Sequence, residues 1–549
     1  MQSWLAPMQR KSMTLALRQR YEIAAGEVGL SQLVLEPDSS IYAAVISKVQ
    51  ENECLSPLAR AGVAWLICTG RYPEEEHLEF LAMALDAKDV NLAVKILTKG
   101  VAKTPRRARS RRLVTVDTPL VDVTRTALET GLSGIPRIVR LVAQHSARLE
   151  KGTLVVWVAG APARVELDPD GNFYYPPEVW GGSRRWFSFS RVLRVTYWRL
   201  MSGLSSLPGG FAARGILRTI LAPLKLLDIG VSMPQEIVWI PEAGILESEV
   251  SVSRAARHLV VWLEAFPQIP LTVLVHDALP LTSPQFFPRD QRLEYLEYAR
   301  LLERASCLIV ANFHLREVMV GLSAVQGRVK PPKIEVVPFP TYSHEWDDSA
   351  SVVVKQSAFY MVGSPDGRKN YQVAVAAAQL VAEWGHQVEL HIIGSAKGVA
   401  PGLRDAIARA RRAGVSIQTH GPVPDEVVLS IARQSLALVY VSKAEGYGLP
   451  VREAQALGCP VIASNIPSNV ELARSGGVSI VDHLSPTAVA RAMKDLIDGK
   501  SDITEYLADN GRVVNVHAYG KRVFELVGSE NSEREQMNIS SQPVSRVVS

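Results

Sequence analysis

Two glutamates, Glu445 and Glu453, lie eight positions apart in the most informative stretch of the sequence. The apolar run Leu436–Val441 before them is typical of a buried strand, so the stretch is expected to leave the carboxyl end of that strand. Two carboxylates at this spacing can reach opposite ends of one elongated ligand. Glu453 is expected in the first turn of the following helix. The alternative interpretation of Glu453 needs no ligand, because the helix dipole favours a carboxylate in that turn.

The residues between the two glutamates are suited to binding an anion. Gly446 and Gly448 permit a tight loop with exposed backbone N–H groups, and Pro450 fits the start of a helix, where a missing N–H costs little. The loop and the helix N-terminus therefore aim several donors at a negative charge. The expected anion contacts are Gly446, Tyr447, Gly448 and Leu449.

A second cluster of chemically useful residues joins another apolar run to a helix. Arg368 and Lys369 come directly before Asn370, which we expect to be the N-cap of that helix. A guanidinium fork and an ammonium point charge beside a helix N-terminus suit the binding of a diphosphate. Two solvated cations in a surface loop are the alternative interpretation of this pair.

The string that runs from Glu445 to Ala454 resembles a known motif. It matches, at every fixed position, the pattern Glu-Gly-Phe/Tyr-Gly-Leu-Pro-x-x-Glu-Ala of family 4 of the retaining GT-B glycosyltransferases. Members of this family also carry Arg-Lys-Asn, or a similar sequence, where Arg368–Asn370 stand here. The resemblance is mannosyltransferase-like, covers about residues 113–526, and does not explain the first hundred residues.

The resemblance implies a role for each of these residues. Arg368, Lys369 and the backbone amides of residues 446–449 would bind the donor diphosphate and stabilise the charge that grows on it. Glu453 would hold the donor ribose, and Glu445 would contact hydroxyls of the sugar as a catalytic residue. The family generally uses no bound metal, so no metal site and no cofactor besides the nucleotide-sugar substrate are expected.

The N-terminal half diverges more from the family pattern. Thr272–Pro280 resembles the strand that ends in His-Asp, which implies that His276 faces the cleft near the transferred sugar as a second catalytic residue. Ser133–Arg137 resembles the Gly-Ile-x-Arg turn of mannosyltransferase-like members. Gly134 would then allow close approach of a ligand, and Arg137 would meet a phosphate or the acceptor. A structural histidine and a surface arginine are the alternatives.

Two departures from the family pattern leave the acceptor and the donor nucleotide open. Val337–Pro340 reads Val-Pro-Phe-Pro where relatives often have Val-Pro-Asn-Gly, and Asn312 stands where a serine often follows the preceding strand. The Gly-Ile-x-Arg and Arg-Lys-Asn resemblance favours GDP-mannose as the donor, with a UDP-sugar as the alternative. A glycan or a lipid-linked molecule is the expected acceptor.

Length and composition limit the classes of protein to which this chain can belong. A chain of 549 residues is too long for one compact core, and its 47% hydrophobic and 21% charged residues exclude global disorder. The net charge of +5 does not identify a nucleic-acid binder, and no nucleic-acid partner is expected. Four scattered cysteines without metal-ligand spacing, and the lack of an evident spanning helix or secretory signal, indicate a cytoplasmic protein.

One basic and aromatic segment, Trp180–Lys225, suits an interfacial surface. Such a surface would place the protein peripherally at the inner membrane face, beside a lipid-linked acceptor. The alternative is that these aromatic residues belong to the core of the N-terminal domain.

Short apolar runs alternate with amphipathic stretches from about residue 113 onward, an order that predicts parallel sheets with helical crossovers. Earlier residues show helical spacing instead. We therefore expect the α/β GT-B fold, two Rossmann-like doubly wound domains facing a cleft, plus an N-terminal helical accessory domain. The expected parts are a helical accessory domain (1–102), an open basic linker (103–112), an acceptor domain (113–340), a donor domain (341–528) and a disordered tail (529–549).

The second half gives the cleaner series of elements. Its expected strands are Phe359–Val362, Val388–Ile393, Val415–Gln418, Leu436–Val441, Pro460–Ala463 and Val478–Val481. Its expected helices include Tyr371–Trp384, Gly402–Ala413 and Asp425–Gln434. Repeated strand–helix units of this size predict one doubly wound sheet.

The expected function is the retaining transfer of a sugar, with mannose favoured, from a nucleotide diphosphate donor to an acceptor hydroxyl. A non-catalytic nucleotide-sugar-binding scaffold is the main alternative, because an intact donor site serves binding and catalysis alike. A glucan phosphorylase shares the GT-B plan but needs a lysine that carries pyridoxal phosphate.

Overall fold

The computed structural model describes residues 2–33, 40–128, 134–158, 160–176, 179, 185–186, 234–248, 254–325, 331–340, 357–394, 402–500 and 515–527. The chain forms two compact units that interleave along its sequence. Unit 1 comprises Met1–Leu274, Leu296–Leu308 and Val523–Ser549, whereas unit 2 comprises Val275–Tyr295 and Ile309–Arg522. The segments expected as an interfacial surface (180–225) and a tail (529–549) lie wholly or almost wholly outside the described residues.

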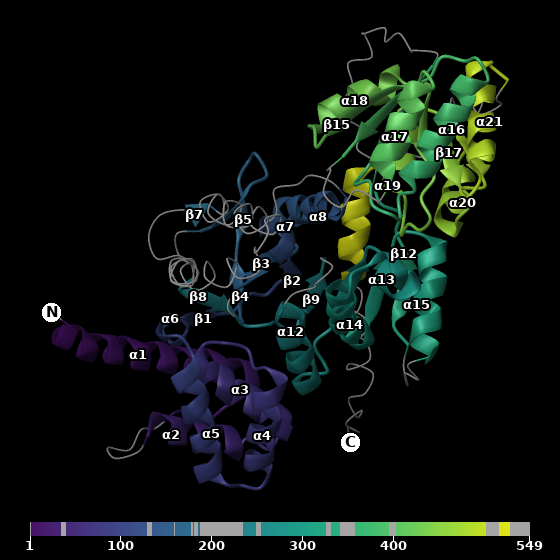
Figure 1. Ribbon diagram of the computed structural model, residues 1–549. Coiled ribbons are helices and arrows are strands. Elements are labelled where there is room, and N and C mark those ends of the chain that lie inside the picture. Colours follow the sequence, from purple (N-terminus) through teal and green to yellow (C-terminus); the bar gives the residue numbers. More distant parts are fainter. Residues whose placement is uncertain are drawn as a thin grey trace, which may run out of the picture. The chain divides into compact units, whose positions relative to one another are not determined.

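Helices open the chain, as the spacing of apolar residues predicts (Figure 1). They are α1 (Gln2–Val28), α2 (Ile41–Glu51), α3 (Pro57–Thr69), α4 (Glu75–Asp86) and α5 (Val90–Lys103). Most residues of α3 are buried, and α1, α2, α4 and α5 all pack on it. Ser56 caps the start of α3 by accepting a hydrogen bond from the N–H of Ala59, and Gly70 ends the helix with a φ of 66°, which glycine adopts without strain.

The basic segment 103–112 is folded, in contrast to the open linker that the sequence predicts. Its elements are the end of α5, α6 (Arg106–Arg109) and the start of β1 (Arg112–Val114). Arg111 is 0% exposed and donates hydrogen bonds to the carbonyl oxygens of Gly70 and Val158. Burial lowers the pKa of Arg111 to about 10, so the guanidinium stays charged at neutral pH. Backbone carbonyl oxygens thus replace water around this cation, which the charge pattern alone does not reveal.

A seven-stranded sheet has the strand order β12-β11-β10-β9-β2-β3-β4. Its strands are β2 (Leu120–Asp122), β3 (Thr153–Trp157), β4 (Pro162–Arg164), β9 (Ile245–Glu247), β10 (Leu271–Val275), β11 (Cys307–Val310) and β12 (Lys333–Val336). The pairs β2–β3, β2–β9 and β9–β10 are parallel, and β4 runs antiparallel to β3. Strands added on both sides of β2 give the doubly wound order that the sequence predicts.

Helices and short strands accompany this sheet. The helices are α7 (Thr124–Leu128), α8 (Ile135–Leu149), α12 (Arg254–Ala265), α13 (Leu279–Thr282), α14 (Arg289–Arg304) and α15 (Phe313–Val325). The short strands are β5 (Glu166–Leu167), β6 (Phe173–Tyr175), β7 (Arg185–Trp186) and β8 (Glu236–Val238), of which β8 pairs with β1. No helix in the described part of the chain has both the length and the apolar character that crossing a membrane requires.

Unit 2 contains a six-stranded parallel sheet in the order β15-β14-β13-β16-β17-β18. The strands are β13 (Ala358–Val362), β14 (Glu389–Ile393), β15 (Ser416–Gly421), β16 (Ala437–Tyr440), β17 (Val461–Ser464) and β18 (Val478–Val481). The helices are α16 (Tyr371–Glu383), α17 (Leu403–Arg412), α18 (Asp425–Gln434), α19 (Leu449–Ala456), α20 (Pro467–Ala473) and α21 (Pro486–Ile497). Every strand and helix that the sequence predicts in this half is confirmed within a few residues.

One face of this second sheet carries the core of unit 2. Alternate strand residues such as Phe359, Met361 and Leu390 point to the same face and are buried against α16, α17 and α21. These three helices lie side by side in Figure 1. Small residues such as Ala374 and Ala378 on α16 let the helix approach the sheet closely. The carboxyl ends of the strands are thereby held on a rigid support.

Two buried carboxyl groups face each other in the sheet of unit 1. Asp122 and Glu247 are register partners on the parallel strands β2 and β9, each is 1% exposed, and their side chains share a hydrogen bond. Asp122 also accepts hydrogen bonds from the N–H and the hydroxyl of Thr124. Burial raises the pKa of Asp122 to about 6, although the bonds from Thr124 oppose this shift.

A raised pKa makes Asp122 a source of pH-dependent stability in unit 1. Because the folded protein holds this proton more tightly than the unfolded chain, its stabilising effect is complete below pH 3.8 and is lost as the pH rises through about 6. We expect Asp122→Asn, which imitates the protonated acid, to remove this dependence and to raise the melting temperature at pH 7.5 by a few degrees relative to the wild type. Melting curves of both proteins at pH 5 and pH 7.5 check this, and an equal offset at the two pH values would contradict it.

Candidate functional site

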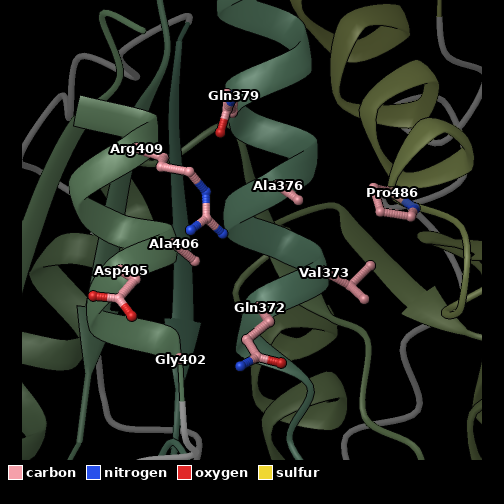
Figure 2. Close-up of a pocket in the computed structure, with 9 residues that line it drawn as sticks. All are labelled: Gln372, Val373, Ala376, Gln379, Gly402, Asp405, Ala406, Arg409 and Pro486. Atoms are coloured by element: carbon pink, nitrogen blue, oxygen red, sulfur yellow. The ribbon is translucent and has the colours of Figure 1, made fainter. Parts of the chain in front are cut away.

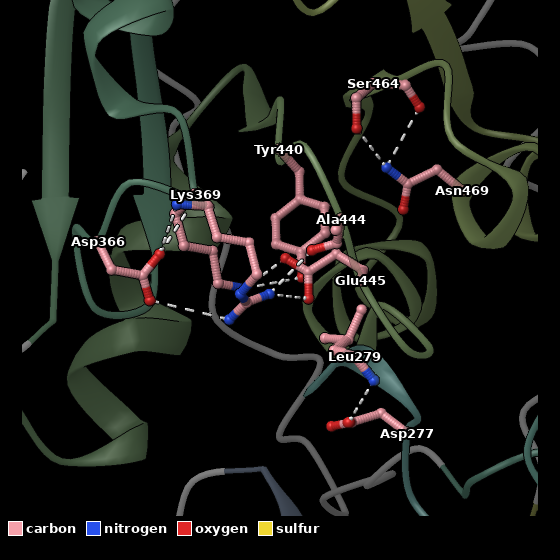
Figure 3. Close-up of polar contacts among 10 residues, drawn as sticks. Asp277, Leu279, Asp366, Lys369, Tyr440, Ala444, Glu445, Ser464 and Asn469 are labelled. Carbon is pink, nitrogen blue, oxygen red and sulfur yellow. Dashed lines mark hydrogen bonds and ion pairs between the residues drawn. The ribbon is translucent and has the colours of Figure 1, made fainter. Parts of the chain in front are cut away.

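A tight turn carries the two cations to the start of α16. The carboxylate of Asp366 accepts hydrogen bonds from the backbone N–H groups of Arg368 and Lys369, each at 3.0 Å. This arrangement fixes the backbone of both cationic residues directly after β13 (Figure 3). The turn that the sequence predicts to hold a diphosphate is therefore preformed.

Asn370 occupies the N-cap position of α16, but its side chain does not cap the helix. Its φ of 56° is left-handed, and its amide donates hydrogen bonds to the carbonyl oxygens of Val441 and His483, at 3.1 and 2.7 Å. The expected N-cap position is confirmed, but no capping bond forms, because the two carbonyls fix the orientation of the side chain and the backbone is not extended as in a usual N-cap. Asn370 instead ties the turn of residues 366–369, the cation turn, to the end of β16, where the glycine-rich loop begins.

The glycine-rich loop after β16 depends on both of its glycines. Gly448 has a φ of 98°, a left-handed value that strains any residue with a side chain, and it precedes α19. Gly446 has no room for a side chain, since a Cβ atom there would lie 2.4 Å from the Cβ of Asp277. The loop therefore packs directly on the turn that follows β10.

Glu445 joins the two clusters within unit 2. Its carboxylate forms ion pairs with the guanidinium of Arg368 at 2.8 Å and with the Nζ of Lys369 at 2.7 Å (Figure 3). The Glu445 side chain is 8% exposed. Arg368 also donates to the carbonyl oxygen of Ala444 at 3.0 Å, and Lys369 donates to the hydroxyl of Tyr440 at 3.0 Å. Residues 76 positions apart thus form one buried network.

The network determines the protonation state of Glu445. Burial alone would raise the pKa of this carboxyl group, but the charges of Lys369 and Arg368 and their hydrogen bonds lower it to about 2. The same pairing raises the pKa of Arg368 against the effect of burial. Because the pKa of Glu445 lies below its usual 4.5, the stability from the pairs is complete above pH 4.5 and is lost only as the pH falls through about 2. Glu445 is therefore an anion at every physiological pH.

His276 is buried in an aromatic cluster. Its ring lies 5.6 Å from that of Phe339, which also meets the ring of Tyr447 at 5.1 Å and that of Tyr519 at 6.2 Å. His276 is 3% exposed, whereas the resemblance implies a side chain that faces a cleft. Phe339, in the Pro-Phe-Pro sequence that departs from the family pattern, thus packs on His276 and on Tyr447 of the glycine-rich loop. The sequence shows the departure but not this packing.

Asp277, the residue after His276, is a half-buried carboxyl group in the site. Burial raises its pKa, while a hydrogen bond from the N–H of Leu279 and the charge of Arg368 oppose the rise. The charge of Glu445 acts on Asp277 as well, in the direction of a higher pKa. The electrostatic surroundings of Asp277 therefore include both members of the Arg368–Glu445 pair.

The remaining predicted site residues are Glu453 in unit 2 and Gly134 and Arg137 in unit 1. Glu453 is half-buried and is the fifth residue of α19, so the expectation that it stands in the first helical turn is wrong; the helix already begins at Leu449. Gly134 precedes α8 with a φ of 63°, and Arg137 lies in the first turn of that helix. Both belong to unit 1, whereas the network belongs to unit 2.

A separate cavity of about 410 Å³ opens between α16 and α17 in unit 2 (Figure 2). Its lining is Gln372, Val373, Ala376, Gln379, Gly402, Asp405, Ala406, Arg409 and Pro486. None of the site residues predicted from the sequence lines it. Among the residues that the structure describes, no group of three or more histidine, cysteine, aspartate or glutamate side chains could hold a metal ion.

Comparisons with known proteins identify the part of the chain that holds this network. Residues 344–514 match the model of the family described as glycosyl transferases group 1. The range contains the cation turn, the glycine-rich loop and Glu453. These residues thus match a glycosyltransferase domain, as the resemblance of the motif predicts.

Three curated relatives match between 35% and 40% of the chain. The serotype-specific mannosyltransferase WbdA of Escherichia coli is 26% identical over 237 residues, 40% of this chain and 29% of its own length. The O-antigen chain mannosyltransferase B of Escherichia coli is 27% identical over 37% of this chain and 55% of its own. The D-inositol 3-phosphate glycosyltransferase of Paenarthrobacter aurescens is 30% identical over 35% of this chain and 47% of its own. The chain therefore spans between about a quarter and about half of the length of these relatives.

Solved structures resemble the chain over a longer range but at low identity. Sucrose-phosphate synthase from Thermosynechococcus elongatus covers 77% of this chain with 14% identity and a TM-score of 0.45. An E. coli structure titled trehalose-6-phosphate bound with UDP-2-fluoro glucose covers 75% of this chain with 12% identity and a TM-score of 0.44.

The packing of Gly446 can be tested by adding a single methyl group. We expect Gly446→Ala to lower the free energy of unfolding by about 1–3 kcal/mol, because the new Cβ overlaps Asp277 and the backbone must shift. Urea unfolding measures this. Gly367→Ala is the matched control, since a Cβ there meets nothing within 4 Å, and its stability should stay within about 0.5 kcal/mol of the wild type. Equal losses in the two variants would contradict the packing of the loop on Asp277.

Proposed function

We propose that this chain, whose residues 344–514 are a glycosyl transferases group 1 domain, transfers a sugar from a nucleotide diphosphate donor to an acceptor hydroxyl with retention of configuration. The observation that carries the proposal is the network of Glu445 with Arg368 and Lys369. Its ion pairs join the loops that follow the carboxyl ends of β13 and β16, which are neighbouring strands of one parallel sheet. Ligands of open α/β sheets bind at this end of the strands.

The network supplies what departure of a diphosphate requires. Negative charge grows on the diphosphate as its bond to the sugar breaks, and fixed cations stabilise this charge best in a site with little water. Arg368 and Lys369 are 17% and 11% exposed, so their charges are only partly screened. The backbone amides of residues 446–449, at the start of α19, add the favourable end of a helix dipole.

We assign the remaining roles by the motif. Glu453 on α19 would hold the donor ribose, Glu445 would contact the hydroxyls of the sugar, and His276 would help to position it. Gly134 and Arg137 would meet the acceptor or a phosphate. The Glu445–Glu453 pair is not proposed as the acid and nucleophile of a hydrolase, whose two carboxyl groups must flank one scissile bond.

Mannose is the sugar that we favour, with GDP-mannose as the donor and no metal or other cofactor. The names of WbdA and of the O-antigen chain mannosyltransferase support mannose, although the D-inositol 3-phosphate glycosyltransferases are not named for this sugar. The proposed acceptor is a glycan or a lipid-linked molecule, and the proposed location is the cytoplasm at the inner membrane face.

A panel of nucleotides tests the donor. We expect GDP and GDP-mannose to raise the melting temperature by several degrees at about 100 times their Kd, because a ligand of the folded state stabilises it by about 2.7 kcal/mol at that concentration. UDP and UDP-glucose serve as the comparison, and Lys369→Met, which lacks the ammonium group, as the protein control. A larger shift with the uridine nucleotides would reassign the donor, and no shift with any nucleotide would contradict the proposed function.

The pairing of Glu445 gives a second test, which separates binding from turnover. A diphosphate has to share the cations with Glu445, so we expect Glu445→Gln to bind GDP about three- to tenfold more tightly while sugar transfer falls. Calorimetry with GDP and a transfer assay with GDP-mannose measure the two effects. Tyr440→Phe removes a contact of Lys369 without changing charge and should not raise the affinity.

Each result of this test decides between alternatives. Weaker GDP binding by Glu445→Gln would mean that the carboxylate aligns the cations rather than competing for them. Unchanged turnover would remove Glu445 from the reaction. Donor binding by the wild type without turnover on any acceptor would favour a non-catalytic scaffold, the main alternative function.

A further inference from the structure

The first turn of α15 is bound by two side chains from different parts of unit 2. Glu471 of α20 accepts hydrogen bonds from the N–H groups of Phe313 and His314, at 2.9 and 3.1 Å. Asn312, the residue before the helix, accepts a bond from the N–H of Leu315 through Oδ1 at 2.7 Å. These three N–H groups lack partners within the helix, so the caps hold its start in place.

The amide of Asn312 has a second partner, which a helix cap does not require. Its Nδ2 donates to the carbonyl oxygen of Gly446 at 2.8 Å, and the residue is 2% exposed. The two partners fix the orientation of the amide, because the N–H of Leu315 needs an acceptor and the carbonyl of Gly446 needs a donor. Neither end of the amide can turn away without leaving a buried polar group unpaired.

Gly446 is thereby held from two sides. Its carbonyl oxygen is bound by Asn312, and its Cα packs so closely on Asp277 that no side chain fits. The residue next to it, Glu445, makes the two short ion pairs with Arg368 and Lys369. A shift of the Gly446 peptide therefore displaces the carboxylate on which that network is built.

We propose that Asn312 is a positioning residue of the donor site. Fixed by its cap on α15, its amide holds the Gly446 carbonyl and so sets the place of Glu445 relative to the two cations. Asn312 itself touches no substrate. The inference rests on the proposed function for its effect on turnover, but its effect on the loop does not depend on that function.

The chemistry of the asparagine makes the proposal testable. Asn312→Asp keeps an oxygen for the cap on Leu315, and aspartate caps helices as well as asparagine does, but it cannot donate to Gly446. Asn312→Ala loses both contacts and adds no charge. A role in capping α15 alone predicts that Asp leaves loop exchange and turnover unchanged and that Ala loses only the cap, about 1 kcal/mol.

The experiment uses the full chain and two readouts. Hydrogen exchange of peptides that cover residues 442–448 reports the loop, and turnover of GDP-mannose reports the reaction. We expect both variants to exchange about tenfold faster in this segment and to lose about 10- to 100-fold in kcat/KM, both measured at a temperature at which each variant is folded. Gly321→Ala on α15 is the control for both readouts, since a Cβ there meets nothing within 4 Å.

Every other result decides against the positioning role. Loop exchange and turnover within twofold of the wild type in either variant would overturn it, and so would slower turnover without faster exchange. An effect confined to Asp would assign the loss to the added charge. If the wild type turns over no nucleotide sugar, the proposed function fails, and exchange of the loop alone then decides whether Asn312 holds it.

Discussion

The site of this protein depends on one buried carboxylate that neutralises two cations. Glu445 approaches Arg368 and Lys369 within 2.8 Å while its side chain is 8% exposed. Removing one member of such a network costs about 3–5 kcal/mol, because an uncompensated charge is left inside the protein. The arrangement therefore needs every support around it: the Asp366 turn, the amide of Asn370, the close packing of Gly446 and the hydroxyl of Tyr440. Fold and site are stabilised by the same contacts.

The fold and the location of the site follow from local patterns in the sequence. Apolar runs such as Leu436–Val441 specify buried strands, and the glycines at 446 and 448 specify a loop at the end of one of them. Parallel pairing of β13 with β16 then brings Arg368, Lys369 and Glu445 together, because loops at the carboxyl ends of adjacent strands share an edge. The doubly wound architecture could be predicted in this way, whereas the likeness to glycosyltransferases comes from the resemblance of residues 445–454 to a known motif.

Contacts between distant side chains could not be predicted. Asn370 looks like a helix cap, but two carbonyl groups far along the chain claim its amide. Arg111 looks like part of a solvated charge run, but carbonyl oxygens surround it. Phe339 and Asn312 look like departures from a family pattern until their neighbours, His276 and Gly446, are known. In each case the residue that forms the contact is determined by tertiary packing. Composition and the spacing of residues in the sequence do not reveal which residue that is.

The interleaving of the two compact units has a consequence for how the molecule can be divided. The chain enters unit 2 at Val275, returns to unit 1 at Leu296, leaves it again after Leu308 and comes back at Val523. In unit 1, the ring of Phe524 stacks on that of His145 at 6.0 Å. No single cut of the polypeptide therefore yields two complete halves, and a fragment that ends before Val523 lacks part of the packing of the unit that contains the N-terminus. Each unit is thus built from several separate segments of the sequence and not from one continuous fragment.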